Sequence, residues 1–260
     1  MLNFQFFRIF VILNASITLN KLTMKKFFVV FLGFIFIAET GFAQANTLSA
    51  KELKQGWKLL FNGENLNGWT SVGKETPPEK GWVVENGILT VNKGGPQRGG
   101  DIITKEQFSD FELIVEFRLT EGANSGIKYF FTQYEKGGWL GLEFQVLDDA
   151  KHPDAKAGRD GNRTQAGLYD MFAPAKNKKN KPIGEWNQAR IVAKGTKVEH
   201  FLNGKKTLSF DRKSDEYKEA FKMSKFKDCE PMFGDVEKGH ILLQEHQDEV
   251  SFRNVKIRVL

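Results

Sequence analysis

Side chains suited to acid–base chemistry gather in residues 141–152. Glu143, Gln145 and Asp148 lie in the run Gly-Leu-Glu-Phe-Gln-Val-Leu-Asp, and His152 follows four residues later. Carboxyl groups act as acids and bases at glycosidic oxygens, amides bind sugar hydroxyls, and a histidine beside a carboxylate can titrate near neutral pH. We therefore expect Glu143, Asp148 and His152 to be catalytic and Gln145 to bind a sugar.

The same run indicates which of these side chains share a surface. Apolar and polar residues alternate over positions 142–147, which is typical of a strand that buries one face. Glu143 and Asp148 are five residues apart, so they would point to opposite faces of a regular strand. Both reach one site only if a bulge lies between them or the strand ends near Leu147. The alternative is an exposed glutamate beside an aspartate that caps a loop.

A second amide and imidazole pair lies near the end of the chain. Residues 241–245 are predicted to form a strand, and Gln244 and His246 are two residues apart. Side chains two apart share one face of a strand, so both are expected to meet Gln145 from a neighbouring strand. Gln244 would then bind substrate and His246 would be catalytic. The alternative is a polar ladder with a structural role.

Three further residues are candidates for binding a sugar. Asn124 could hydrogen-bond to hydroxyl groups, although Asn-Ser-Gly is also an ordinary turn sequence. Tyr169 and Trp139 could stack on a pyranose ring. We expect no cofactor and no metal site. Bound Ca²⁺ remains an alternative, because one loop carries several oxygen ligands without the spacing of a Ca²⁺ loop, namely Asp149, Asp154, Asp160 and Asn162.

The elements that must position these residues are mostly strands. Residues 82–85 and 88–91 flank Asn86-Gly87, and Asn203-Gly204 is a second two-residue hairpin signal. Apolar residues alternate with charged residues over 111–119, which predicts a long half-buried strand. One short helix is expected over 215–223, capped by Ser214. The pattern favours an all-β sandwich or jelly roll formed as one domain by residues 46–260.

The first 45 residues are interpreted as an upstream extension followed by a signal peptide. Basic residues follow Met24, an apolar stretch covers 27–38, and Ala43-Gln-Ala45 fits a cleavage site. We expect export to the periplasm or the medium, without a membrane anchor after cleavage; a two-helix anchor is the alternative. Without the leader the net charge falls from +6 to +3, which gives no reason to expect nucleic acid. Cys229 is the only cysteine, so no internal disulfide is possible.

Several short motifs follow one another in a recognisable order along residues 56–257. They are Gly56-Trp-Lys-Leu-Leu-Phe-Asn-Gly63, Leu66-Asn-Gly-Trp69, Gly100-Asp-Ile-Ile-Thr104, Asn124-Ser-Gly-Ile127, Leu142-Glu-Phe-Gln-Val-Leu-Asp148, Ile241-Leu-Leu-Gln-Glu-His246 and Phe252-Arg-Asn-Val-Lys-Ile257. Their joint order resembles the 3-keto-disaccharide hydrolase domain family. The resemblance implies a concanavalin A-like jelly roll of two antiparallel sheets. It also implies cleavage of glycosides already oxidised to a ketone at C3, by a hydrolase or a lyase route. Members often carry an arginine where this chain has Lys128, so Lys128 is a candidate substitute in substrate binding.

A ketone at C3 suggests a mechanism, because it acidifies the hydrogen on C2. His152 or His246 could remove that proton, and amide or ammonium donors such as Lys128 could stabilise the enolate. Glu143 or Asp148 could then protonate the leaving oxygen. Direct hydrolysis by two carboxyl groups is the competing route. A noncatalytic carbohydrate-binding module and a surface or matrix protein are the alternatives from other functional classes, because the fold also hosts lectins.

Overall fold

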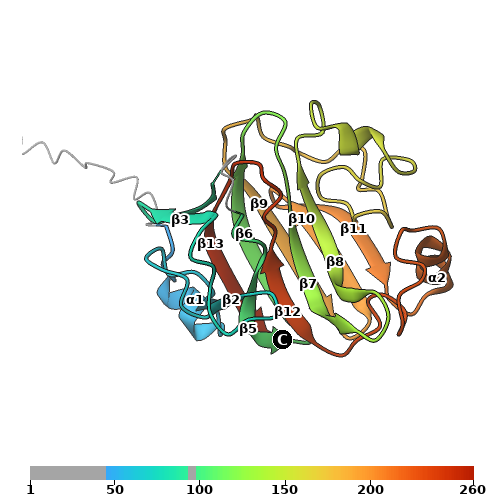
Figure 1. The fold of residues 1–260 in the computed structure, drawn as a ribbon, viewed down its shortest axis with the longest axis horizontal. Coiled ribbons are helices and arrows are strands. Elements are labelled where there is room, and N and C mark those ends of the chain that lie inside the picture. Colours follow the sequence, from blue (N-terminus) through green and yellow to red (C-terminus); the bar gives the residue numbers. More distant parts are fainter. Residues whose placement is uncertain (1–44, 93–97) are drawn as a thin grey trace, which may run out of the picture. The chain divides into compact units, whose positions relative to one another are not determined.

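Two antiparallel β-sheets pack face to face in the domain (Figure 1). The structure is a computed structural model and describes residues 45–92 and 98–260. The predicted leader lies outside these residues except for Ala45. Within the described residues, no helix is both long and apolar enough to cross a membrane. The expected all-β jelly-roll class is confirmed.

The larger sheet has eight strands in the order β11-β10-β9-β6-β13-β4-β3, with β1 also pairing with β13. The smaller sheet has five strands in the order β2-β5-β12-β7-β8, so β8 forms one of its edges. The strands of the larger sheet are β1 (Lys58–Leu59), β3 (Trp82–Glu85), β4 (Ile88–Val91), β6 (Phe111–Leu119), β9 (Asn187–Lys194), β10 (Lys197–Leu202), β11 (Lys205–Asp211) and β13 (Val250–Val259). Those of the smaller sheet are β2 (Trp69–Ser71), β5 (Ile102–Phe108), β7 (Asn124–Tyr134), β8 (Gly138–Leu147) and β12 (Gly239–Leu243).

Both predicted hairpins form, and their turns have the backbone angles that the sequence requires. Asn86 and Gly87 have φ of 52° and 76°, and Asn203 and Gly204 have φ of 51° and 79°. Positive φ at both central residues gives a turn whose twist matches the flanking strands. The turns join β3 to β4 and β10 to β11, which pair antiparallel as predicted.

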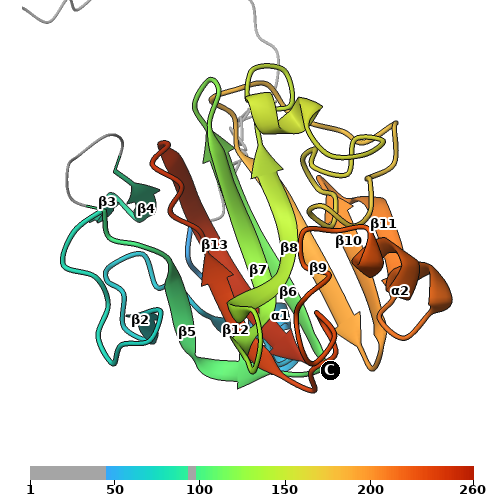
Figure 2. The same ribbon diagram turned by 45° about the vertical axis from the view of Figure 1, so that its right-hand side comes forward.

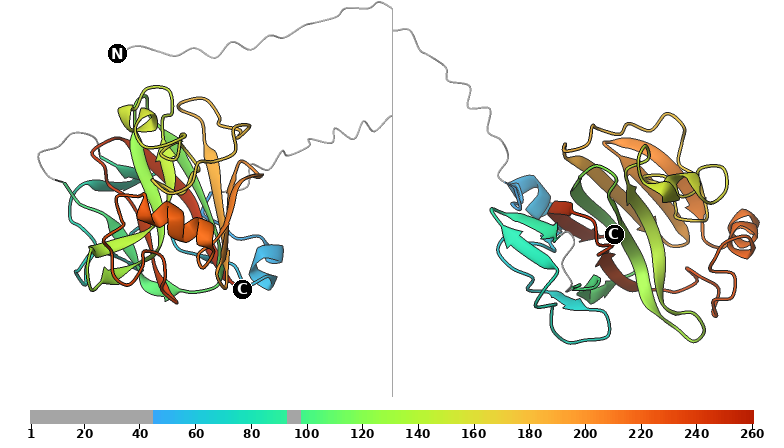
Figure 3. Two further views of the ribbon diagram at one scale, coloured as in Figure 1. Left: turned by 90° about the vertical axis from the view of Figure 1, so that its right-hand side faces the viewer. Right: turned by 45° about the horizontal axis from the view of Figure 1, so that its top comes forward.

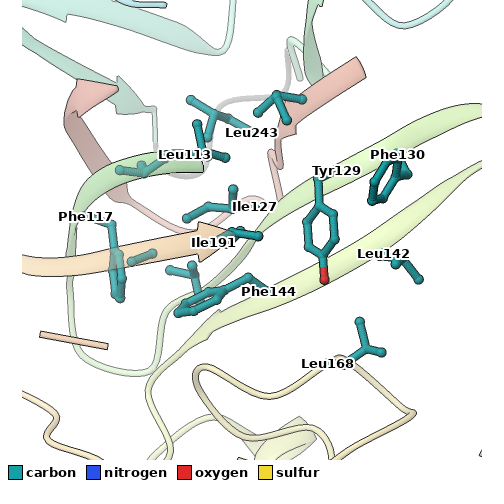
Figure 4. Close-up of a cluster of buried hydrophobic side chains, with 14 of the residues drawn as sticks. Leu113, Phe117, Ile127, Tyr129, Phe130, Leu142, Phe144, Leu168, Ile191 and Leu243 are labelled. Atoms are coloured by element: carbon teal, nitrogen blue, oxygen red, sulfur yellow. The ribbon is translucent and has the colours of Figure 1, made fainter. Parts of the chain in front are cut away.

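The core fills the space between the two sheets. Figure 4 shows part of it, with Leu113 of β6 and Ile191 of β9 approaching Ile127 and Tyr129 of β7. These four side chains are at most 1% exposed. A register shift in the pairing of β7 with β8 follows Tyr129, and Phe130 is also fully buried. The apolar faces predicted from alternation therefore meet each other, and the polar face of β7 and β8 points outward.

The expected helix is α2 (Asp215–Lys222), and Ser214 Oγ accepts a hydrogen bond of 3.1 Å from the Tyr217 N–H. It lies beside the β11 side of the domain (Figures 1 and 3). Two short helices were not predicted, α1 (Ala50–Lys54) and a 3₁₀ helix over Pro153–Lys156. Each spans too few residues to give a helical period.

The loop that follows β8 returns along the edge of that strand (Figure 2). Backbone hydrogen bonds join Gln145 N to Gly167 O at 3.2 Å, Ala166 N to Gln145 O at 2.9 Å and Tyr169 N to Glu143 O at 3.0 Å. These bonds satisfy the otherwise open edge of the sheet. They also place Tyr169 beside Glu143, so the loop forms a wall at the polar face of β8.

Candidate active site

The pairing of β7 with β8 brings the first charged pair of the site together. Lys128 lies opposite Glu143 in the register, and Lys128 Nζ is 3.6 Å from Glu143 Oε2. The glutamate is only 7% exposed. With its amide oriented to suit its neighbours, Gln145 donates from Nε2 to Glu143 Oε1 at 3.1 Å and to Ser125 O at 3.0 Å. Each carboxylate oxygen of Glu143 therefore has its own partner.

A glycine makes room for this carboxylate. A Cβ added at Gly126 would lie 2.8 Å from the carboxyl carbon of Glu143 and closer still to Oε1. The missing side chain lets Glu143 lie against the backbone of β7. Burial raises the pKa of Glu143, while the positive charges of Lys128 and Lys225 act in the opposite direction. A carboxyl group with a raised pKa is suited to act as a general acid.

These groups line a pocket of about 180 Å³. Seven of the ten residues predicted for the site line it together: Asn124, Lys128, Glu143, Gln145, Tyr169, Gln244 and His246. The other lining residues are Leu140, Gly141, Lys225 and Phe226. The structure therefore gathers acid, amide, ammonium, phenol and imidazole groups from both ends of the chain around one small space.

Lys225 was missed by the sequence analysis. It follows α2, and no periodicity or motif connects it with β8. Its Nζ lies 4.2 Å from the ring centroid of Tyr169, and its backbone N–H donates to Asp170 Oδ2 at 2.7 Å. Burial lowers the pKa of Lys225; Glu143 opposes this change, and the positive charges of Lys128 and Arg163 add to it.

The imidazole side of the pocket comes from the chain just after β12. This strand ends at Leu243, earlier than predicted, but Gln244 N still donates to Gly126 O at 3.0 Å. Gln244 and His246 therefore reach the pocket, as the period of two suggested. His246 Nδ1 is 4.0 Å from Asp248 Oδ2, which also accepts from Asn124 N at 3.0 Å.

Asn124 carries a polar atom that a bound molecule could satisfy. The residue is 5% exposed, and its Oδ1 has no hydrogen-bond partner among the described residues. A buried acceptor without a donor is unfavourable by about 1–3 kcal/mol. Since Asn124 lines the pocket, a hydroxyl group of a ligand could supply the missing donor.

His152 lies next to the pocket, but it does not line it. Its ring meets that of His246 edge to face, with centroids 6.2 Å apart. Its Nδ1 accepts from Asp154 N at 3.1 Å and so caps the 3₁₀ helix. The neutral ring therefore carries its proton on Nε2. His152 is placed to contact His246 and not to meet a substrate directly.

One group of side chains has a donor set that could hold a metal ion. Ligand atoms of His152, His246 and Asp248 lie within 4.8 Å of one another. Two imidazoles and a carboxylate suit a divalent transition metal. Binding through Nε2 of His152 would, however, require the other tautomer and the loss of the hydrogen bond from Asp154. Among the residues considered as Ca²⁺ ligands, Asp149 forms an ion pair with Lys178 Nζ at 2.7 Å.

The structure does not bring Asp148 into the pocket. Its carboxylate accepts from the backbone N–H groups of Gly122 at 2.8 Å, Ala150 at 3.0 Å and Lys151 at 3.3 Å. Strand β8 ends at Leu147, as one of the two expected routes required, but the chain then turns away. Asp148 therefore fixes this turn, and the expectation that it meets Glu143 in one site is corrected.

Trp139 also lies outside the pocket lining. Its ring stacks on Phe131 with centroids 5.6 Å apart and an interplanar angle of 21°. It packs with Ile103 and Leu242 in a small apolar cluster on the smaller sheet. The indole therefore has a protein ring as its stacking partner.

Asp101 is a second residue that the sequence analysis did not select. Burial raises its pKa, and the charge of Lys128 and a 2.9 Å hydrogen bond from Glu245 N act to lower it. Its negative charge also acts on His246. A charged residue directly before the apolar strand β5 is the signal that could have identified it.

Comparisons with known proteins agree with this architecture. A family described as the 3-keto-α-glucoside-1,2-lyase-like domain matches residues 56–258. A 3-keto-disaccharide hydrolase of Bacteroides thetaiotaomicron is 37% identical over 244 residues, covering 84% of this chain and 83% of that protein. A glycosyl hydrolase candidate from Parabacteroides distasonis has a TM-score of 0.71 and 29% identity, covering 83% of this chain and 99% of its own. A second glycosyl hydrolase candidate from that organism has a TM-score of 0.62 and 26% identity, covering 78% of this chain and 99% of its own.

Proposed function

Because the chain belongs to the family of 3-keto-α-glucoside-1,2-lyase-like domains and is a glycoside hydrolase-like enzyme, we propose that it cleaves glycosides that carry a ketone at C3. One observation carries the proposal. A single pocket holds a buried carboxyl group, two lysine side chains and an imidazole. Cleavage by elimination needs an acid, a centre of positive charge and a base.

The reaction begins at C2 of the sugar. A ketone at C3 acidifies the C2 hydrogen because the carbanion is stabilised as an enolate. His246 is the base in this proposal, since its side chain is 47% exposed and open to the pocket. Asp248 Oδ2 lies 4.0 Å from His246 Nδ1, so a carboxylate stands beside the ring that accepts the proton.

The enolate oxygen needs positive charge that is already in place. Lys128 lines the pocket and pairs with Glu143 at 3.6 Å, so a ketone bound beside it meets a fixed ammonium group. Such preorganised charge is worth most in a site that excludes water. We therefore propose that no metal or cofactor is needed.

Glu143 completes the cleavage as the general acid. Burial raises its pKa, which suits this carboxyl group to donate a proton to the leaving oxygen at C1. Addition of water to the resulting double bond gives net hydrolysis. Release before this addition gives a lyase product. The unpaired Oδ1 of Asn124 would accept a sugar hydroxyl and orient the ring.

Proton NMR in D₂O tests the proposal with 3-keto-trehalose or a 3-keto-β-glucoside as substrate. We expect cleavage with loss of the C2 hydrogen: a hydrolysis product carries deuterium at C2, and an unsaturated lyase product carries no hydrogen there. A hydrolysis product incubated without enzyme should retain C2–H, and full turnover with C2–H retained would contradict the enolate route and support direct hydrolysis. Binding without turnover by the wild type would instead indicate a noncatalytic carbohydrate module.

Export is part of the proposed function. We propose that translation starting near Met24 yields a precursor cleaved after Ala45, which would place the enzyme in the periplasm or the medium. N-terminal sequencing of protein recovered from these fractions tests this point. A mature chain that retains residues 24–45 would contradict it.

A further inference from the structure

Lys225 is exposed overall, and its side chain lines the pocket. Its Nζ lies over the Tyr169 ring at 4.2 Å and over the Phe226 ring at 5.2 Å. Among the described residues, no hydrogen bond or ion pair to this Nζ is found within 4.0 Å. Lys128 differs because it forms an ion pair with Glu143 at 3.6 Å. The pocket therefore contains one lysine amine that is held by rings and left open on its polar side.

We propose that Lys225 forms a covalent iminium with the C3 ketone of the substrate, an inference that rests on the function proposed above. The Nζ of the neutral amine attacks the carbonyl carbon, and one N–H proton and one proton from solvent pass to the ketone oxygen, which leaves as water. The resulting C3 iminium withdraws electrons from C2 more strongly than the ketone does. Removal of the C2 proton by His246 then gives an enamine in place of an enolate.

The remaining steps return the enzyme to its starting state. The enamine electron pair forms the C1–C2 double bond, and the C1–O bond breaks while Glu143 protonates the leaving oxygen. Water then adds to the iminium carbon and releases the unsaturated ketone together with the neutral amine of Lys225. The proton taken by His246 passes to solvent. No oxidant, reductant or metal takes part.

The surroundings of Lys225 favour the neutral amine that this attack requires. Contact with the pocket wall partly desolvates its amine, although the residue stays exposed overall, and the nearby charges of Lys128 and Arg163 disfavour a further positive charge. Both effects lower the pKa of an amine and are used in lysines that form Schiff bases. The negative charge of Glu143 opposes this lowering of the Lys225 pKa. The position of Lys225 over the aromatic rings and the positive charges near it therefore both favour the neutral amine.

The chain around Lys225 is fixed, so the amine is held in position. Asp170 accepts the backbone N–H of Lys225 with one oxygen and binds Arg163 Nε with the other at 2.8 Å. Phe226 stacks on Phe233 with ring centroids 4.2 Å apart. These contacts hold the segment after α2 against the wall formed by Tyr169.

Reductive trapping provides the direct test. The full-length mature enzyme is incubated with a 3-keto-glycoside and sodium cyanoborohydride, and the modified peptide is mapped by mass spectrometry. We expect a sugar adduct on Lys225. Lys225→Arg keeps the charge without a reactive amine, so it should give none. Lys128→Arg is the matched control and should still give the Lys225 adduct.

A second readout works on the unmodified wild type and does not depend on the folding of a variant. Iminium formation exchanges the C3 ketone oxygen with water, so ¹⁸O from H₂¹⁸O should enter the substrate faster with enzyme than without it. Cleavage with C2 deuteration but without adduct or enzyme-dependent ¹⁸O exchange would overturn the iminium and leave the proposed function intact. An adduct on Lys128 would overturn the assignment to Lys225. Absence of both cleavage and adduct would overturn both proposals.

Discussion

The two carboxylate oxygens of Glu143 have different surroundings, and this difference bears on its role. Oε1 accepts from the Gln145 amide at 3.1 Å, while Oε2 faces the Lys128 ammonium at 3.6 Å. Lys128 favours the ionised form, and burial favours the neutral form more strongly, so the pKa is raised. A carboxylic acid in this environment can give its proton to a leaving group and then take up a new proton from solvent.

Glu143→Gln removes this proton and nearly preserves the shape of the side chain. For substrates whose leaving alcohol is weakly acidic, we expect kcat/KM to fall by roughly 10²–10⁴-fold, the usual contribution of a general acid. For a 3-keto-glucoside of 4-nitrophenol the loss should be small, because that oxygen leaves without protonation. The comparison of kcat/KM across leaving groups is the measurement. Glu230→Gln, at a carboxylate that is 68% exposed and paired with Lys136, is the control.

An equal loss for good and poor leaving groups would be inconsistent with an acid role for Glu143. It would instead fit a residue that removes the C2 proton or only positions the substrate. The exposed-site variant should match the wild type for every leaving group.

At the scale of elements, the site depends on how closely β7 and β8 can approach each other. Gly126 lies opposite Gln145 in the register, and the space above it is filled by the Glu143 side chain. The glycine is therefore a steric requirement for the observed position of the Glu143 carboxylate.

Gly126→Ala tests this requirement. The new methyl group would meet the end of a flexible side chain, so we expect Glu143 to move while the free energy of unfolding changes by less than about 1 kcal/mol. A displaced catalytic group can lower activity by roughly 10²-fold. Combining the change with Glu143→Gln should add little further loss, since both act on the same group. Additive losses in kcat/KM would contradict the steric explanation, and thermal unfolding checks the stability.

The strand elements could be predicted from the sequence because their signals are local. Asn86-Gly87 and the alternation over 111–119 depend only on neighbouring residues. Gln244 and His246 were correctly brought together with Gln145 by the period of two, even though β12 ends at Leu243. Such rules work within an element and, at this strand end, up to three residues beyond it.

The rest of the site depends on tertiary contacts that no local pattern contains. Lys225 reaches Tyr169 only because the segment after α2 packs against the loop that follows β8. Asp148 has the same residue type as a catalytic acid, but three backbone N–H groups occupy its carboxylate after the turn. Residue type and spacing predicted both Glu143 and Asp148 as candidates. The direction of the chain after β8 places only Glu143 in the pocket.

On the scale of the whole molecule, a buried polar pair links the two sheets. His200 of β10 is fully buried, and its Nε2 accepts from the Tyr129 hydroxyl of β7 at 2.7 Å. Its Nδ1 faces Ala166 O at 3.4 Å, so the ring also contacts the loop beside the site. Burial lowers the pKa of His200 from 6.5 to about 3, against the opposing effect of Ala166 O.

This lowered pKa predicts how stability depends on pH. The folded protein holds His200 neutral, whereas the unfolded chain takes up a proton below about pH 6.5. Its contribution to stability is complete above pH 6.5 and declines as the pH falls towards 3, by about 1.4 kcal/mol per pH unit. We expect urea unfolding of His200→Leu to show a shallower loss between pH 6 and 4 than the wild type. Parallel curves would mean that His200 does not control this loss. Since the ring also contacts Ala166 O, the loop behind Tyr169 should loosen before global unfolding, and the amide protection factors of residues 166–168, corrected for the intrinsic pH dependence of exchange, should fall first on acidification.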